Sequence, residues 1–261
     1  MTDIELICGA ALEAGRLALR LRDRGLVISR KADGSPVTNG DLAVDELLKA
    51  RLGAARPDYG WLSEESADSA ERLDRQRVFI VDPVDGTSAY LGGKPWFVVC
   101  IAVVEAGRPV AAAIYAPATR ELYQAVEGGG ALCNEQPIAP SDAVTLNACR
   151  MLGDAQLFKR SLPGKSWPQM QVARRNAIAY RMALVAAGTF DAAVSPGWKH
   201  DWDIAAGDLI AREAGAIVTD TQGERLVFNT PSARNLGMIC AAPTLHPLIL
   251  KRTAPIDQLQ A

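Results

Sequence analysis

The sequence has few of the residue types from which most metal and redox sites are built. Its 261 residues include two histidines, His200 and His246, so a site of clustered imidazoles is hard to assemble. The five cysteines are scattered and never form C-x-x-C, which predicts buried hydrophobic side chains and not a disulfide framework or a zinc site. Chemistry must therefore rest mainly on carboxylates, whose oxygens suit hard cations such as Mg²⁺.

Long hydrophobic runs and a large excess of charge of one sign are also lacking. No apolar run approaches the ~20 residues that cross a bilayer. The order Met1-Thr2-Asp3-Ile4-Glu5 places acid where a signal peptide carries positive charge. The formal net charge is -2, so nucleic-acid polymers and anionic membranes are poor partners. These features predict a cytoplasmic enzyme or binding protein.

Hydrophobic periodicity predicts two halves of different character. The first half reads as two helices followed by strands joined through short turns, which is typical of an antiparallel meander. The second half alternates strands and helices. The predicted helices cover 3–24, 39–52, 177–187 and 204–214, and the predicted strands cover 61–63, 78–81, 97–104, 110–115, 121–126, 146–152, 170–173, 191–195 and 216–219. We therefore predict an α+β protein with an α+β half over 1–140 and a smaller α/β half over 141–261.

The densest group of chemically capable residues runs from Val81 to Thr87, Val81-Asp82-Pro83-Val84-Asp85-Gly86-Thr87. A hydrophobic strand ends in two carboxylates, and Pro83 lacks the N–H that a central ladder needs. The following Gly86-Thr87-Ser88 is a common way to open a helix, where backbone N–H groups attract phosphate. Two acids beside an anion site would repel the anion, so this segment predicts bridging Mg²⁺.

Four further acidic residues flank this segment in the sequence. Glu64 and Glu65 follow a short strand, Asp41 lies near one helix start, and Asp203 lies near another. Each has an ordinary explanation by itself, as a solvated pair of surface acids or as a helix cap. Their order along the chain is more informative than any one of them.

Four motifs in this order resemble those of the inositol monophosphatase superfamily. They are V-T-x-x-D (Val37 to Asp41), E-E (Glu64-Glu65), D-P-x-D-G-T (Asp82 to Thr87) and W-D-x-A-A-G (Trp202 to Gly207). Each is weak alone, but chance does not readily produce all four in sequence. The resemblance implies the layered αβαβα sandwich of the sugar phosphatases. It also implies Mg²⁺-dependent hydrolysis of a small soluble phosphate monoester, and it makes a homodimer possible.

The resemblance also implies metal ligands at matching positions. Glu64, Asp82 and the backbone carbonyl of Val84 would hold one Mg²⁺ ion, and Asp82, Asp85 and Asp203 would hold a second. A third, weaker ion would share Glu64 with water molecules, so two to three ions are expected. Coordination lowers the pKa of a bound water by several units, which makes a hydroxide nucleophile accessible without a histidine base.

Catalytic and substrate contacts follow from the same motifs. Asp41 and Thr87 resemble the hydrogen-bonded pair that orients and helps to deprotonate the attacking water, with Glu64 assisting through its ion. Backbone N–H groups of Gly86 and Thr87 would bind the phosphate, and Ser88 adjoins them. Asp85 and Asp203 are expected to contact substrate as well as metal.

The identity of the ester is less constrained. Arg181 is basic where inositol-type members tend to carry Asn, and a cation there suits a second phosphate. Pro196 occupies the position, counted without gaps, of a glutamate that binds sugar hydroxyls in inositol-specific members. Ala177-Ile178 replaces the G-S pair of nucleotidases, and Ala89 stands where many members have Asn or Glu, which argues against a simple match.

These features rank the bacterial 3'(2'),5'-bisphosphate nucleotidase branch first, with 3'-phosphoadenosine 5'-phosphate as substrate. Inositol-1-monophosphatase ranks second and histidinol-phosphate phosphatase third, the latter because Tyr180 and Lys199 are similar to that branch. Trp198 could stack on a purine or pack under a loop. A phosphate-binding relative without turnover is the alternative from another class, and it is disfavoured because every expected ligand is present.

Overall fold

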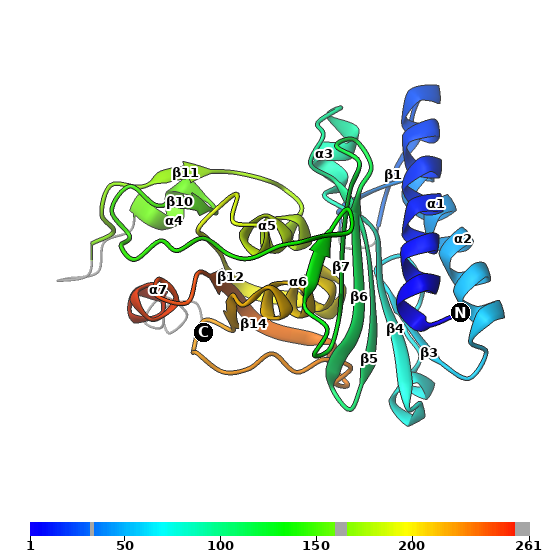
Figure 1. Cartoon of the computed structure of the whole chain (residues 1–261). Helices are drawn as coiled ribbons and strands as arrows, with labels where there is room; N and C mark the ends of the chain where they lie inside the picture. Colours follow the sequence, from blue (N-terminus) through cyan, green and yellow to red (C-terminus); the bar gives the residue numbers. More distant parts are fainter. Residues whose placement is uncertain (32–33, 160–165, 254–261) are drawn as a thin grey trace.

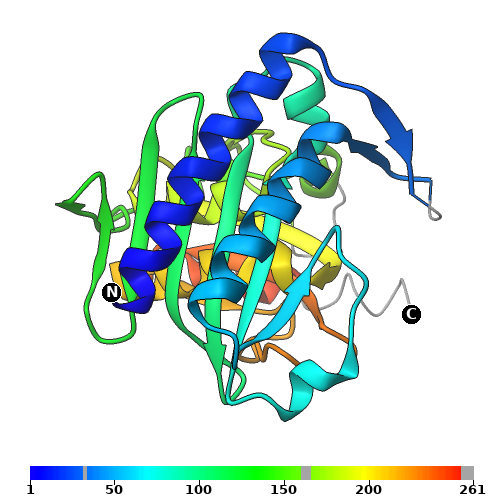
Figure 2. The same ribbon diagram turned by 90° about the vertical axis from the view of Figure 1, so that its right-hand side faces the viewer.

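Five alternating layers of helix and sheet make up the structure, a computed structural model that describes residues 1–31, 34–159 and 166–253 (Figures 1 and 2). A pair of long helices covers one face of a seven-stranded sheet, and a second pair covers the other face. The second pair also packs on a five-stranded sheet, whose far face carries the last helical layer. The predicted αβαβα sandwich is confirmed. The division near residue 140 stays a prediction.

The seven-stranded sheet is mostly the predicted antiparallel meander. Its middle strands pair in sequence order, and β7 has the predicted bounds. Two features differ from the prediction: β3 pairs parallel to β4, and two short strands extend the sheet beyond the glycines at 128–130. The strands, in spatial order, are β3 (Gly60–Ser63), β4 (Arg77–Asp85), β5 (Val98–Glu105), β6 (Arg108–Ala116), β7 (Glu121–Val126), β8 (Ala131–Cys133) and β9 (Gln136–Pro137).

Two long helices, α1 (Asp3–Arg24) and α2 (Asn39–Ala55), lie on the outer face of this sheet (Figure 2). α1 covers the predicted residues because Thr2 forms a capping box at its start and Gly25, at φ 97°, ends it. Gly15 allows close contact with the sheet, since a Cβ atom there would lie 2.4 Å from Cδ1 of Tyr115. Small side chains on the inner face thus bring the helix close to the strands.

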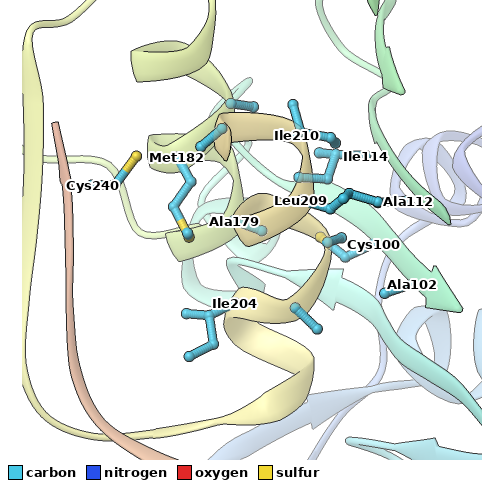
Figure 3. Close-up of a cluster of buried hydrophobic side chains, with 14 of the residues drawn as sticks. Cys100, Ala102, Ala112, Ile114, Ala179, Met182, Ile204, Leu209, Ile210 and Cys240 are labelled. Atoms are coloured by element: carbon cyan, nitrogen blue, oxygen red, sulfur yellow. The ribbon is translucent and has the colours of Figure 1, made fainter. Parts of the chain in front are cut away.

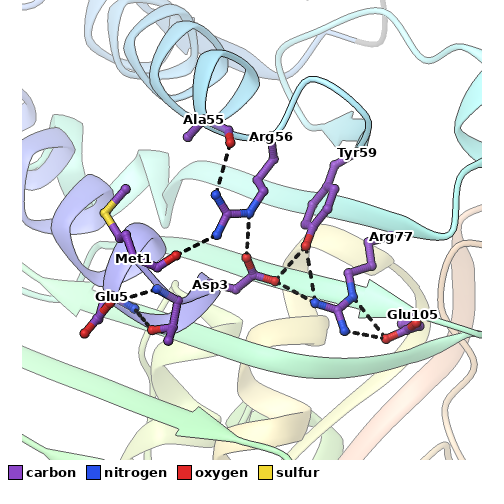
Figure 4. A network of polar contacts seen from close by, with 9 residues as sticks. Met1, Asp3, Glu5, Ala55, Arg56, Tyr59, Arg77 and Glu105 are labelled. Atoms are coloured by element: carbon purple, nitrogen blue, oxygen red, sulfur yellow. Dashed lines mark hydrogen bonds and ion pairs between the residues drawn. The ribbon is translucent and has the colours of Figure 1, made fainter.

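A network of charged groups fixes the start of α1 to the sheet (Figure 4). Asp3 accepts hydrogen bonds from Arg56 Nε, Arg77 Nη1 and Tyr59 OH, each at 2.9 Å. Arg77 in turn donates to Glu105 Oε2 of the neighbouring strand at 2.9 Å. The network joins α1, the end of α2 and two strands through charge-assisted bonds.

Shorter elements connect the long helices to the strands of the first sheet. β1 (Ile28–Arg30) and β2 (Pro36–Thr38) form an antiparallel hairpin that leads into α2. A 3₁₀ turn, η1 (Ala70–Asp74), and a short helix, α3 (Thr87–Leu91), flank β4.

The five-stranded sheet is mixed. β10, β11 and β12 run parallel to one another, whereas β14 pairs antiparallel with both β12 and β13. β12 was predicted to end at Ser195, but it runs on to His200 across an irregularity in register between Ser195 and Trp198. The order is β11 (Gln171–Ala173), β10 (Arg150–Leu152), β12 (Ala192–His200), β14 (Arg234–Ala241) and β13 (Ile217–Thr219).

Helices cover both faces of this sheet. α5 (Ile178–Ala186) and α6 (Asp201–Ala214) lie between the two sheets, while α4 (Ala155–Lys159) and α7 (His246–Thr253) pack on the outer side through the cluster that contains Met151. β14, α4 and α7 were not predicted. α6 begins at Asp201, three residues earlier than predicted, because His200 serves as its N-cap.

The main core lies between the two sheets and is rich in small residues (Figure 3). Cys100 and Ile114 from the first sheet face Leu209 of α6, and Met182 of α5 packs beside them. A Cβ atom at Gly207 would lie 2.7 Å from Sδ of Met182, so this glycine sets the spacing of the two helices. In the part of the chain that the structure describes, no helix is both long and apolar enough to cross a membrane.

Candidate active site

The candidate site forms where β4 ends beside α2, α5 and α6. Asp82 pairs with Cys100 and Asp85 pairs with Val98, so β4 uses one residue more than β5 over this stretch. This bulge contains Pro83, where the absence of an N–H costs no ladder bond. The strand does not stop at Pro83 as the sequence suggested, because pairing resumes at Asp85.

Asp82 and Asp85 are both buried, at 1% and 5% exposure. Asp82 Oδ1 accepts a hydrogen bond from Val84 N at 3.0 Å. Asp85 accepts from Ile178 N at 3.1 Å and from Ala179 N at 2.7 Å, so it caps the start of α5. Asp85 therefore caps a distant helix and not the adjacent α3.

The predicted pair Asp41 and Thr87 is brought together. Thr87 Oγ1 lies 3.3 Å from Asp41 Oδ1 and 3.3 Å from Val84 O, and its single hydroxyl hydrogen can be donated to either oxygen. Thr38 N donates to Asp41 Oδ2 at 2.9 Å, and the Thr38 hydroxyl also bonds this oxygen. Burial raises the pKa of Asp41, and the bonds from Thr38 partly oppose that shift.

Glu64 and Glu65 follow β3, which lies alongside β4. Glu64 N donates to Val81 O at 3.3 Å, one residue before Asp82. Lys31, from the hairpin of β1 and β2, places Nζ at 2.8 Å from Glu64 Oε1 and 2.8 Å from Glu65 Oε1. Burial raises the pKa of Glu65 to about 7, although Lys31 acts in the opposite direction. The two glutamates are therefore not the solvated surface pair that their sequence alone would suggest.

Sequence reasoning missed two residues that position this corner. Lys31 directly follows Arg30, and no motif or spacing distinguishes it from an ordinary surface lysine. Asp45 accepts from Ser63 Oγ and from Ser66 Oγ, each at 2.5 Å, and so holds both ends of the segment that carries Glu64. Asp45 lies four residues after Asp41 on α2, so its position on the same helix face could have been noticed.

Asp203 lies in the first turn of α6. Its Oδ2 accepts from His200 N at 3.0 Å, which makes it the third helical residue and not the cap that the sequence suggested. Burial raises the pKa of Asp203 to about 7, and the charge of Glu64 adds to this effect. His200 stacks on Trp202 with ring centroids 4.3 Å apart, so these two rings flank the start of the helix.

The charges of these acids act on one another. Burial holds the pKa of Asp82 well above its usual range, and Glu64, Asp85 and Asp203 push it further in the same direction. Burial and the charge of Asp203 do the same to Asp85. Acids from the four motifs therefore act on one another, although Asp41 and Asp203 are 162 residues apart in the sequence (203 minus 41).

A cluster of buried carboxylates is stable when cations offset the repulsion. Within the described residues, no three His, Cys, Asp or Glu side chains are placed to hold one ion together. Several oxygens instead accept from backbone N–H groups or from Lys31. The donor set of carboxylates with a nearby carbonyl suits Mg²⁺ in chemical type. Ligation by Glu64, Asp82, Val84, Asp85 and Asp203 stays a proposal.

The predicted phosphate-binding turn lies at the same corner. Gly86 adopts φ 95°, and a Cβ atom there would lie 3.1 Å from Ala177 Cβ and from Trp96 O. Glycine is therefore required both by its conformation and by the close approach of α5. The helix that Thr87 opens has only five residues, and Ser88 is exposed.

A basic cavity lies beside Arg181, whose charge acts on Asp85. Arg174, Arg181 and Asp154 line it with Val194, Ser195 and Pro196, and its volume is ≈ 260 Å³. Arg181 Nε donates to Arg175 O at 2.6 Å, and its charge acts on Asp85. The predicted basic residue is thus placed beside the acidic cluster. Trp198 is 63% exposed, so it does not pack under a loop.

Comparison with known proteins agrees with this geometry. The chain matches the Inositol monophosphatase family over residues 2–258. It is 37% identical over 232 residues to the inositol-1-monophosphatase of Mesorhizobium japonicum, covering 84% of this chain and 86% of that protein. It is 33% identical over 232 residues to the Nus factor SuhB of Xylella fastidiosa, covering 84% and 82% of the two.

Solved structures of similar proteins point to the same family. The IMPase of Thermotoga maritima matches with a TM-score of 0.85 and 25% identity, over 100% of both chains. The suhB protein of Bartonella henselae matches with a TM-score of 0.81 and 29% identity, over 95% of this chain and 97% of that one. The chain thus belongs to the inositol monophosphatase family and is a metal-dependent phosphoric monoester hydrolase.

Proposed function

We propose that this phosphatase acts on a small phosphate monoester that carries a second anionic group, with 3'-phosphoadenosine 5'-phosphate as the first candidate. The observation that carries the proposal is the cavity in which Arg174 and Arg181 outnumber the single acid, Asp154. Arg181 belongs to α5, the helix whose first backbone N–H groups donate hydrogen bonds to Asp85. A substrate with its ester at the acidic cluster could therefore place a second phosphate on these guanidinium groups.

The residues at the acidic cluster have complementary roles in this proposal. Glu64, Asp82, the Val84 carbonyl, Asp85 and Asp203 would hold two to three Mg²⁺ ions. Bound Mg²⁺ would lower the pKa of a water molecule and offset charge on the phosphoryl oxygens.

Thr87 and Asp41 would position the attacking water. Thr87 Oγ1 would accept a hydrogen bond from it and pass its own proton toward Asp41, whose Oδ1 lies 3.3 Å away. Backbone N–H groups of Gly86 and Thr87 would hold the phosphate, near the exposed hydroxyl of Ser88. Burial of Asp41 favours proton acceptance, since it raises the pKa of this carboxyl.

Inositol 1-phosphate is the second candidate. It is favoured by the similarity to the inositol-1-monophosphatase of Mesorhizobium japonicum. The cavity offers one acid for sugar hydroxyls, Asp154, while Pro196 has no side-chain acceptor. Histidinol phosphate ranks third, because its ammonium group would meet two arginines in the same cavity.

A phosphate-release assay tests the proposal. Release would be measured with and without Mg²⁺ on adenosine 3',5'-bisphosphate, inositol 1-phosphate, histidinol phosphate and fructose 1,6-bisphosphate. Arg181→Gln should lower kcat/KM for the adenosine bisphosphate at least about tenfold, and that for inositol 1-phosphate by less than about threefold. The matched control is Arg175→Gln, because Arg175 stacks on Trp96 with its guanidinium 4.5 Å from the ring centroid and does not line the cavity.

Two outcomes would contradict the proposal. If inositol 1-phosphate gave the highest kcat/KM, the first choice of substrate would be wrong. If Arg181→Gln reduced turnover of all four esters equally, Arg181 would not bind a second anionic group.

A further inference from the structure

A second basic cavity lies far from the acidic cluster. It has a volume of ≈ 250 Å³, and its charged lining consists of Arg108, Arg212, Arg225 and Asp208. The apolar part of its wall comes from Pro109, Val218, Leu226 and Val227. Three guanidinium groups against one carboxylate leave an excess of positive charge in a concave site.

The distance from the active site follows from the sheet. Arg108 follows the turn between β5 and β6, and it pairs with Glu105, which in turn pairs with Arg77 at the start of β4. Asp85, at the other end of β4, pairs with Val98. Seven residues of β5 separate the two ends, which corresponds to roughly 23 Å. Figure 1 shows this hairpin turn at the opposite end of the sheet from α3.

The walls of the cavity are fixed by tight backbone geometry. Ala106 and Gly107 both have positive φ, at 49° and 76°, as in the turns that close twisted hairpins. Gly107 O accepts a hydrogen bond from Phe228 N at 3.0 Å, so the turn is joined to the segment that carries Arg225. Arg108 and Arg225 are therefore held near each other although they are 117 residues apart in the sequence (225 minus 108).

Only one of the three arginines has its charge matched. Arg212 Nε donates to Asp208 Oδ2 at 3.0 Å, and Asp208 is 3% exposed. In the described parts of the chain, neither Arg108 nor Arg225 forms a side-chain hydrogen bond or an ion pair with another residue. Both still lie close enough for their charges to act on Asp208. Isolated surface arginines are normally solvated, but two unpaired guanidinium groups that converge on one cavity are typical of an oxyanion site.

We propose that this cavity is a second ligand site, which binds a small oxyanion with two negative charges, such as a phosphate or a small phosphorylated molecule. Its volume is below that of most sites for drug-sized ligands, roughly 300 Å³ and above, which favours a compact ligand. Phosphate could bridge Arg108 and Arg225 while Arg212 remains paired with Asp208. The site does not depend on the substrate proposed above.

The test uses inorganic phosphate as the probe, with the full chain in a buffer that contains EDTA at constant ionic strength. Chelation leaves the acidic cluster without divalent cations, so phosphate is repelled there. Isothermal titration calorimetry should detect this site in the wild-type protein, and any phosphate held by Arg174 and Arg181 would appear as a separate site that both double variants described below retain. The double variant Arg108→Gln/Arg225→Gln should bind phosphate at least about tenfold more weakly, because charge-assisted hydrogen bonds are lost.

The matched control is Arg16→Gln/Arg20→Gln, which removes the same two charges from exposed positions on α1. Its phosphate affinity should stay within about twofold of the wild-type value, since general charge effects alone are small and screened. Both double variants should keep the wild-type kcat with Mg²⁺, because none of the four arginines lies at the acidic cluster. An unchanged kcat would show that both variants are folded.

Three results would overturn the proposal. The first is that the wild-type protein binds no phosphate in EDTA. The second is that the Arg108→Gln/Arg225→Gln variant binds phosphate as tightly as the wild type. The third is that the Arg16→Gln/Arg20→Gln control loses as much phosphate affinity as the Arg108→Gln/Arg225→Gln variant. The substrate assay above would be unaffected by any of them, so the two proposals fail separately.

Discussion

Asp45 offers the sharpest test of how the fold positions the acidic cluster. Its carboxylate is 7% exposed and accepts two short hydrogen bonds, from Ser63 Oγ and Ser66 Oγ at 2.5 Å each. These serines bracket Glu64 and Glu65. Removing the carboxylate with Asp45→Ala should therefore loosen the segment and leave two hydroxyl groups without their partner.

The expected loss of stability follows from the two bonds. A hydrogen bond to a charged group contributes about 1.5–3 kcal/mol, and Ser66 is half-buried, so water can replace part of its bond. We expect Asp45→Ala to lower the free energy of unfolding by about 3 kcal/mol. For a chain of this size, that corresponds to a fall in Tm of roughly 6–12 °C. Ser66→Ala, which removes one of the two bonds, should cost about half as much.

A positioning role also predicts an effect on activity. The Mg²⁺ concentration for half-maximal activity should rise about tenfold in Asp45→Ala, as it does when groups behind metal ligands are removed. At saturating Mg²⁺, kcat should recover to within about threefold, because Asp45 does not touch the substrate. Urea unfolding and Mg²⁺ titration of phosphate release measure the two effects.

Either of two results would contradict this positioning role of Asp45. One is a change in unfolding free energy below about 0.5 kcal/mol, which is the size of an ordinary surface substitution. The other is an unchanged Mg²⁺ requirement in a destabilised variant, which would make Asp45 purely structural.

The other predictions concern one proposed metal ligand, an ion pair and two glycines. Asp203→Asn should lower kcat at least about 100-fold at saturating Mg²⁺ while circular dichroism stays unchanged, and near-normal phosphate release would refute its role. Burial alone would raise the pKa of Asp191, but hydrogen bonds from its arginine partner on β10 outweigh this and keep the pKa low. A carboxyl with a lowered folded pKa stabilises the protein above its unfolded pKa and loses that contribution as the pH falls through the folded value. At pH 7 the free energy of unfolding of Asp191→Asn should therefore be about 1–2 kcal/mol below that of the wild type, and this difference should disappear as the pH falls. A difference that stays the same at every pH in urea unfolding would contradict a stabilising ionised Asp191. Gly15→Ala should destabilise the protein by about 1 kcal/mol net, because overlap with Tyr115 exceeds the gain in helix propensity. Gly53→Ala, on the same helical layer but with open space around its Cβ, should instead raise Tm, and equal effects of the two substitutions would show that packing at α1 is not the cause.

Local sequence patterns predicted many of the elements. The helix over 3–24 has the expected bounds because capping residues stand at both ends. β7 also agrees, since turn residues delimit it on both sides. Short elements such as β8, β9 and α4 were missed, because two to five residues do not contain enough periodicity to define a type.

Contacts between distant residues could not be predicted in the same way. Asp85 directly precedes Gly86-Thr87-Ser88, which opens the adjacent helix, but its carboxylate caps α5, which begins 93 residues further along the chain. Asp203 proved to be the third residue of α6, because the strand before it continues to His200. In both cases the partner lies on another element, and no local pattern reports such a contact.

The sequence by itself determined the reaction class, because four short motifs specify which residue types occur and in which order. The periods of 3.6 and 2 distinguished its longer helices from its strands, and the layered architecture followed from the resemblance that those motifs carry. Only the tertiary structure decided that Lys31 lies on Glu64 and Glu65 and that Asp45 holds the segment between two serines. It also decided that one basic cavity contains Arg181, near Asp85, and that another lies at the far end of β4 and β5. The physical reason is that charge interactions depend on distance in space, which folding sets among residues far apart in the chain.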